Sequence, residues 1–180
     1  FTALQSPYVT LRISVASSLG SIHRRHPSLI EKHKENLLVA IENEKNFYGK
    51  MRQTSLELPQ ENPLEKSLVS LLQQRSEISI ETLFRLLSIQ FDNTSMLFAY
   101  HGIIGRQSKQ RQLAIELINN SLPKTLAETL IDAIGGVHTG NNHKHIYAVS
   151  LNELKNEKDS MIAQIAQAVI KTHAGEPMTD

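Results

Sequence analysis

Apolar residues recur every three or four positions along almost the whole chain, which is the spacing of α-helices that bury one face. Few stretches alternate with the period of a β-strand. The first stripe follows Ser6 and Pro7, which we expect to cap and to open a helix. Its inward residues are predicted to be Leu11, Val15, Leu19 and Ile22.

Prolines separate the next two stripes. A second helix is expected to begin near Ser28, because Glu31 three residues later gives the spacing of a capping box. We predict a break in this helix around Asn46 or Gly49, and a loop over residues 59–63, where two prolines lie. The apolar positions of the two stripes are Leu37, Leu38 and Ile41, and then Leu64, Leu68, Leu71 and Leu72.

The stretch from Ile80 to Phe91 has the strongest pattern. Its apolar face is wide enough to indicate contact on more than one side, as in the middle layer of a stack. Residues 92–95 can cap a short following helix, which Gly105 can end. The inward residues are predicted to be Ile80, Leu83, Phe84, Leu86, Leu87, Ile89 and Phe91, and then Met96, Leu97, Tyr100, Ile103 and Ile104.

Three more helices are predicted in the rest of the chain. One spans Arg111 to Leu122, one opens at Pro123 and stops at Gly135, and one lies near the C-terminus. We expect a loop over residues 137–150 and a flexible tail over residues 174–180. The inward residues are predicted to be Leu113, Ala114, Leu117 and Ile118, then Ala127, Leu130, Ile131 and Ile134, then Ile162, Ile165, Ala166, Val169 and Ile170.

These elements predict an all-α fold of about seven to nine helices, with a single domain over residues 1–173. Short connections suit either a bundle or a solenoid. Segments 8–19 and 108–117 are similar, since each places an arginine, Arg12 or Arg111, at the start of a helix before small and apolar positions. This degenerate repeat favours the solenoid. In it, the guanidinium of Arg12 can reach backbone carbonyls or a carboxylate of a neighbouring repeat.

The segment at Arg12 resembles the second helix of a HEAT repeat, in which Val-x-x-Arg precedes a small-residue face. More specifically, Thr82–Phe91 followed by Arg111–Leu122 resembles the HEAT regions attached to bacterial membrane proteins of the ATP/ADP translocase type. There a Phe-Arg-Leu-Leu helix precedes the pattern Arg-x-x-Ala-x-Glu-Leu-Leu-Asp-Asn-x-Leu. Ile118 and Asn119 depart from that pattern. The resemblance covers residues 63–136 and, loosely, 1–29. It implies an α-α superhelix beside a transporter, and no transport residue is carried over.

Composition restricts the partners and the chemistry. Nineteen basic and eighteen acidic residues give a formal charge of +1, which does not indicate attraction of the whole chain to nucleic acid. The absence of cysteine excludes disulfides, cysteine–zinc sites and thiol nucleophiles, and it fits a reducing compartment such as the cytoplasm. No apolar stretch reaches the roughly 20 residues of a membrane span.

A histidine cluster is the main candidate for metal binding. His138, His143 and His145 lie within one short segment, and imidazoles can hold a transition metal. No carboxylate is adjacent, and Lys144 between two of the histidines opposes a cation. A polar loop is the favoured interpretation, and whether this loop binds anything stays open.

Other motifs point away from catalysis. Gly135, Gly136 and Gly140 lack the preceding strand and the following Lys-Ser/Thr of a phosphate-binding loop, so a helix stop explains them better. Carboxylate pairs such as Glu42 with Glu44, and Glu153 with Glu157, lie among lysines and are assigned to polar faces. We therefore assign no catalytic residue, no cofactor and no metal ligand.

The segment His23–Lys34 is rich in cations that can contact phosphates of nucleic acid or of lipid headgroups. Cations near a helix C-terminus are also favoured by the macrodipole, which explains residues 23–26 without any ligand. Glu31 and Glu35 partly neutralise the second half, and no interleaved aromatic offers a stacking platform.

We expect a non-catalytic helical-repeat scaffold. The resemblance implies the cytoplasmic regulatory or interaction domain of an ATP/ADP translocase-like transporter, held near the membrane by another part of the polypeptide. The start at Phe1 indicates a fragment of a longer chain. The expected partner is a protein or the attached membrane domain, and nucleic acid is not expected. The alternative is a free-standing HEAT adaptor that binds protein or nucleic acid through His23–Lys34.

Overall fold

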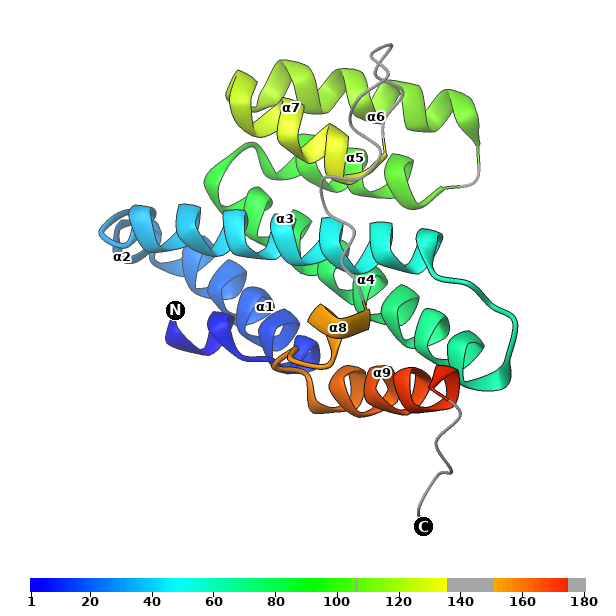
Figure 1. The fold of residues 1–180 in the computed structure, drawn as a ribbon. Helices are drawn as coiled ribbons and strands as arrows, with labels where there is room; N and C mark the ends of the chain where they lie inside the picture. Colours follow the sequence, from blue (N-terminus) through cyan, green and yellow to red (C-terminus); the bar gives the residue numbers. More distant parts are fainter. Residues whose placement is uncertain (106, 136–150, 175–180) are drawn as a thin grey trace.

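The computed structural model describes residues 1–105, 107–135 and 151–174. Every regular element in these ranges is helical, which confirms the all-α prediction, and the nine α-helices among them agree with the seven to nine helices expected (Figure 1). Within the same ranges, no helix is both long and apolar enough to cross a membrane. The elements are the 3-10 helix η1 (Thr2–Gln5) and the α-helices α1 (Val9–Arg25), α2 (Pro27–Glu31), α3 (Lys34–Glu57), α4 (Pro63–Gln90), α5 (Asn93–Ile104), α6 (Ser108–Ser121), α7 (Lys124–Ala133), α8 (Leu151–Leu154) and α9 (Ser160–His173).

Helix α4 is the centre of the molecule and contacts α1, α3, α5 and α9. It begins with Pro63 in its first turn and with a complete capping box between Asn62 and Glu65. No glycine or second proline interrupts it, so the two predicted stripes of residues 64–72 and 80–91 lie on one continuous helix. The wide face is buried, from Ile80 to Ile89, and α4 packs against several helices, which confirms the predicted contact on more than one side.

The predicted start near Ser28 is correct to within one residue, but the predicted capping box and the predicted break are wrong. Helix α2 begins at Pro27 rather than Ser28 and has no side-chain cap, so the expected Ser28–Glu31 capping box does not form. Helix α3 runs without a break through Gly49. A glycine inside a helix costs about 1 kcal/mol relative to alanine. The long packing face between α3 and α4 offsets that cost.

Helix α1 is rotated relative to the predicted stripe. Pro7 lies before the helix, and Ser6 Oγ accepts a hydrogen bond from the Tyr8 amide at 3.1 Å instead of capping the first turn. Leu11 and Ile22 are exposed, contrary to prediction. The residues of α1 that the structure buries are Val9, Arg12, Ala16 and Leu19. The face turns because Arg12 lies inside, which an apolar pattern cannot anticipate.

Helices α5 and α6 pack more closely than their sequences predict. A side-chain carbon on Gly102 would lie 2.6 Å from Cβ of Ala114 and 2.8 Å from the carbonyl oxygen of Gln110. Asp92 caps α5 by accepting a hydrogen bond from the Ser95 amide at 2.7 Å, as expected from residues 92–95. Hydrogen bonding from the Ser95 side chain, and then from its amide, holds the pKa of Asp92 below its usual value. The predicted inward residues that are exposed instead are Leu97, Ile104 and Leu113.

Helix α7 agrees with the sequence prediction. Pro123 is its N-cap, and the predicted inward residues Ala127, Leu130, Ile131 and Ile134 are all buried. Gly135 follows with a φ of +69°, a backbone conformation that glycine adopts without strain. Residues 136–150, and with them the predicted loop, lie outside the described part, as do residues 175–180 of the predicted tail.

Helix α9 packs on α4 and closes a second apolar cluster. The cluster contains Met51, Leu68, Leu71 and Leu72 together with Leu154, Ile162, Ala166 and Val169. Ion pairs flank it: Arg75 Nε lies 2.7 Å from Asp159 Oδ2, Lys50 pairs with Glu157, and His173 Nε2 lies 2.6 Å from Glu65 Oε1. The carboxylates of Asp159 and Glu65 also serve as helix caps, so the docking of α9 depends on the same groups that begin α9 and α4.

Replacing Gly102 with alanine should destabilise the protein by about 1–3 kcal/mol, because the new methyl group overlaps Ala114 and Gln110. Gly20→Ala is the matched control, since a Cβ there would meet only the Arg24 guanidinium at 3.8 Å. This control should be neutral or stabilising by about 0.5–1 kcal/mol through helix propensity. Chemical denaturation measures both variants. Equal stability of the two would contradict the close α5–α6 crossing.

Stability should fall in acid partly through Glu65. Its hydrogen bonds with His173 and with the amides of Glu61 and Asn62 hold its pKa below the usual 4.5. The unfolded chain therefore binds this proton first as the pH falls. The stabilising contribution is complete above about pH 4.5 and is lost as the pH falls through the folded value. In urea unfolding, the free energy of unfolding of Glu65→Gln should fall less steeply with decreasing pH than that of the parent. Glu128→Gln, which changes an exposed ion pair, should behave like the parent. Parallel acid limbs for Glu65→Gln and the parent would disprove this role.

Candidate functional site

The basic segment His23–Lys34 forms a surface, here called the basic corner, that contains the end of α1, all of α2 and the start of α3. The structure places α2 at one end of the molecule (Figure 1). Arg24, Arg25 and Lys32 are exposed, and Leu29 between them is 48% exposed. The cations predicted from the sequence are therefore accessible, while binding by the basic corner stays a prediction.

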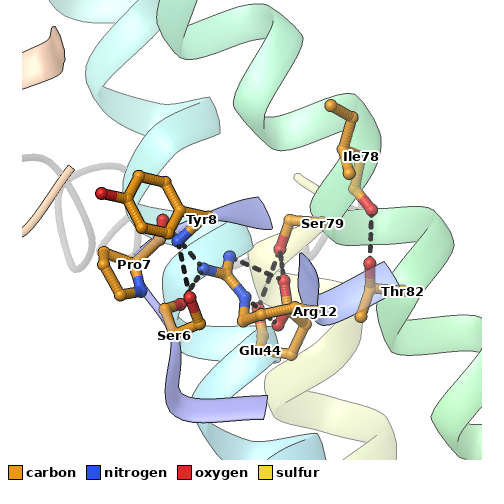
Figure 2. A network of polar contacts seen from close by, with 8 residues as sticks. All are labelled: Ser6, Pro7, Tyr8, Arg12, Glu44, Ile78, Ser79 and Thr82. Carbon is orange, nitrogen blue, oxygen red and sulfur yellow. Dashed lines mark hydrogen bonds and ion pairs between the residues drawn. The ribbon is translucent and has the colours of Figure 1, made fainter. Parts of the chain in front are cut away.

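Beneath the α1 helix lies a buried polar network that sequence reasoning did not identify (Figure 2). The guanidinium of Arg12, on a residue only 5% exposed, donates from Nε to Oε2 of Glu44 at 2.7 Å and from Nη2 to Oε1 at 3.1 Å. It also donates from Nη1 to the carbonyl oxygen of Ser6 at 2.8 Å and lies over the ring of Phe47. The sequence predicted that Arg12 reaches backbone carbonyls or a carboxylate of a neighbouring repeat. It binds the Ser6 carbonyl and the Glu44 carboxylate, and the assignment of Glu44 to a neighbouring repeat stays a prediction.

The network joins three helices. Ser79, fully buried on α4, donates its hydroxyl to Oε1 of Glu44 at 2.5 Å. Glu44 belongs to α3 and is 3% exposed, so its assignment to a polar face is wrong. Both carboxylate oxygens are occupied by donors, and the charge is paired within hydrogen-bond distance. This arrangement stabilises the crossing of α1, α3 and α4 rather than presenting a free acid or base.

Arg111, near the start of α6, also donates hydrogen bonds to neighbouring segments. Its Nη2 donates to the carbonyl oxygen of Ile134 at 2.8 Å, and its Nη1 lies 3.5 Å from that of Ile103. Arg111 therefore binds the carbonyl of Ile134, the C-cap residue of α7, and a carbonyl of the preceding helix α5. A cation is also favoured at the C-terminus of α7 by the helix dipole. Both arginines of the degenerate repeat thus connect their own helix to a preceding and a following segment.

A second buried cation joins α3 to α7. Lys45 has a side chain only 3% exposed and donates to both carboxylate oxygens of Glu42, at 2.7 and 2.8 Å. Its third bond goes to Oγ1 of Thr129 at 2.9 Å. All three ammonium donors are used, so this lysine acts as a structural link and is not free to act as a nucleophile.

The titratable groups of the core do not indicate an activated catalyst. Burial raises the pKa of Tyr48, with nearby Arg52 and Arg111 opposing the shift, and burial also raises the pKa of Tyr100. A raised pKa keeps a phenol protonated at neutral pH, so neither tyrosine is prepared as a base or nucleophile.

The predicted histidine cluster cannot be placed. His138, His143 and His145 lie outside the described residues, as do Gly136 and Gly140. Within residues 1–105, 107–135 and 151–174, no group of three or more His, Asp or Glu side chains is arranged to hold a metal ion. Gly135 ends α7, in agreement with the helix-stop interpretation.

Breaking the Arg12–Glu44 pair from either side should cost about 3–5 kcal/mol, because each single truncation leaves a buried charge without its partner. The double variant Arg12→Met with Glu44→Leu should recover most of that loss, since neither charge then remains buried. A double-mutant cycle by urea unfolding measures the coupling. The matched control, Arg85→Met with Glu81→Leu, removes a partly exposed pair on α4 and should show coupling below about 1 kcal/mol. Coupling of the buried pair as small as that of the control would contradict its structural role.

Comparison of the chain with family models, with curated proteins and with solved structures finds no match. The function must therefore be argued from the geometry and chemistry of the chain itself.

Proposed function

We propose that this chain is a non-catalytic scaffold of HEAT-like helical repeats, whose role is to present a surface to another protein or to an attached domain. The observation that carries the proposal is the equivalent placement of Arg12 and Arg111. Each lies early in its helix, donates to a carbonyl of the segment before it and reaches a group on a helix that follows. Repeated polar links of this kind are what a stack of related units would use to keep neighbouring helices in register.

The residues that carry the family resemblance support a shared architecture. Phe84 and Leu87 on α4 and Ala114 and Ile118 on α6 are all buried, so these positions serve packing. Asn119, which departs from the pattern, is exposed, and the lost charge therefore leaves no buried partner unpaired. In line with the resemblance, we propose that the chain is the cytoplasmic interaction or regulatory domain of an ATP/ADP translocase-like membrane protein.

Scaffolding also agrees with the way ionisable groups are used. The buried charges Arg12, Glu44 and Lys45 have partners inside the protein, and their hydrogen-bonding capacity serves the helix crossings. An enzyme needs at least one such group poised towards a substrate. The accessible charges lie on the outer surface, where they are suited to contact a partner.

A second candidate is a free-standing adaptor that binds protein or nucleic acid through the basic corner. The exposure of Arg24 and Arg25 favours this candidate. Salt-dependent binding to duplex DNA, lost in Arg24→Ala with Arg25→Ala, would support it over the transporter-linked role.

The gene on either side of this chain tests the main proposal. A polypeptide with about ten or more apolar spans of roughly 20 residues before Phe1 is the expected result. In addition, restoring the residues that precede Phe1 should raise the melting temperature, because each unit of a solenoid buries its apolar face against its neighbours. Thermal unfolding followed by circular dichroism gives the comparison. A gene without such spans would reject the transporter link, and an unchanged or lower melting temperature would count against the solenoid.

A further inference from the structure

We propose that the basic corner is a docking surface for an anionic lipid membrane. This inference deepens the proposed role of a scaffold beside a membrane and rests on it only for the location. It concerns a direct contact of this chain with lipid headgroups, made in addition to any attachment through another part of the polypeptide.

The geometry of the corner presents an apolar tip between cations. Ile30 of α2 is buried in the main apolar cluster and fixes the orientation of this short helix. Its neighbour Leu29 is 48% exposed, and Ile22 at the end of α1 is 36% exposed. Because α2 lies at one end of the molecule (Figure 1), a planar surface can approach it without meeting the rest of the stack.

The basic corner has several cations close together in the sequence, and most of them form no ion pair within the described part of the protein. Residues 23–34 contain four Lys or Arg residues and one Glu, whereas the whole chain has a formal charge of only +1. Among the residues that the structure describes, Arg25 and Lys32 form no ion pair, and Arg24 contacts only the hydroxyl of Ser21 at 3.1 Å. Lys34 lies 3.6 Å from Glu31, and both side chains of that pair are exposed.

The helix dipoles favour some of these cations but not all of them. His23, Arg24 and Arg25 lie in the last turn of α1, where the helix dipole favours cations. Lys32 is the C-cap residue of the short helix α2, whereas Lys34 is the first residue of α3, where the dipole of α3 disfavours a cation. Lys34 therefore gains nothing from the dipole of its own helix, and an external anion would stabilise it there.

A membrane fits the corner better than a nucleic acid does. An anionic bilayer offers phosphates to the cations and an apolar layer to Leu29 at the same contact. A nucleic acid would satisfy the cations but not the leucine, and the segment His23–Lys34 contains no Phe, Tyr or Trp on which bases could stack. Binding through so few cations is weak and reversible, which suits a second, supporting attachment.

Vesicle flotation tests the proposal with the chain as it is. The probes are vesicles of phosphatidylcholine with about 30% phosphatidylserine, and vesicles of phosphatidylcholine alone, at about 0.1 M salt. The parent protein should partition into the anionic vesicles and not into the neutral ones. Arg24→Gln with Arg25→Gln should lower that partition by about tenfold or more, since each cation near such a surface contributes roughly a factor of five.

Matched control variants test whether vesicle binding depends on the basic corner itself, rather than on the total charge or the total exposed apolar surface of the protein. Lys109→Gln with Lys124→Gln removes the same charge from exposed positions on α6 and α7, and should change the partition by less than about twofold. Leu29→Ser should weaken binding severalfold. Leu113→Ser, at a position 45% exposed on α6, should not. Circular dichroism confirms that each variant is folded.

Three outcomes would overturn the membrane contact: no partition of the parent protein into the anionic vesicles, an equal loss in the Lys109 and Lys124 control, or tight binding of duplex DNA or a poly-glutamate peptide without vesicle binding. The last of these would assign the corner to a nucleic acid or an acidic protein. The result is independent of the transporter link, because a gene without membrane spans rejects that link while leaving vesicle binding intact.

Discussion

The buried ion pair between Arg12 and Glu44 is the interaction on which the rest of the stack depends. It links α1 to α3, and through Ser79 it also links both to α4, so three helices meet at one carboxylate. Two charges withdrawn from water stabilise a protein only if their geometry is good and their remaining hydrogen-bonding groups are satisfied. Here the surrounding carbonyls, the serine hydroxyl and the Phe47 ring meet that condition. The pair therefore specifies which faces of these helices meet.

The two long helices α3 and α4 make most of the remaining packing contacts. Helix α4 contacts α1, α5 and α9, and α3 contacts α4 and α7, so the long central pair carries both ends of the stack. Towards α6 and α7, the helices are joined by the close packing of Gly102 against Ala114 and by the hydrogen bond from Arg111 to the Ile134 carbonyl. At the other end α9 is joined by apolar packing and by carboxylates that are also helix caps.

The buried charges and the exposed charges of the protein have different surroundings. The charges inside the protein hold helices together, while Arg24, Arg25 and Lys32 are exposed at the basic corner, where α1, α2 and α3 meet at one end of the molecule. Leu29 is exposed beside these cations, whereas the buried charges of Arg12, Glu44 and Lys45 are paired within the fold.

The sequence by itself determined the helical class, most helix ends and the burial of the widest stripe, because local propensity, caps and periodicity act over a few residues. The stripe from Ile80 to Ile89, the Asp92 cap and the Gly135 stop are examples. It also indicated the exposed cations of the basic corner. Only the tertiary structure decided that Glu44 and Lys45 are inside, that Leu11 and Leu113 are outside, and that α3 passes Gly49 unbroken. Those outcomes depend on partners such as Arg12, Thr129 and α4, which lie far away in the chain or on another helix, and no pattern within a single helix contains that information.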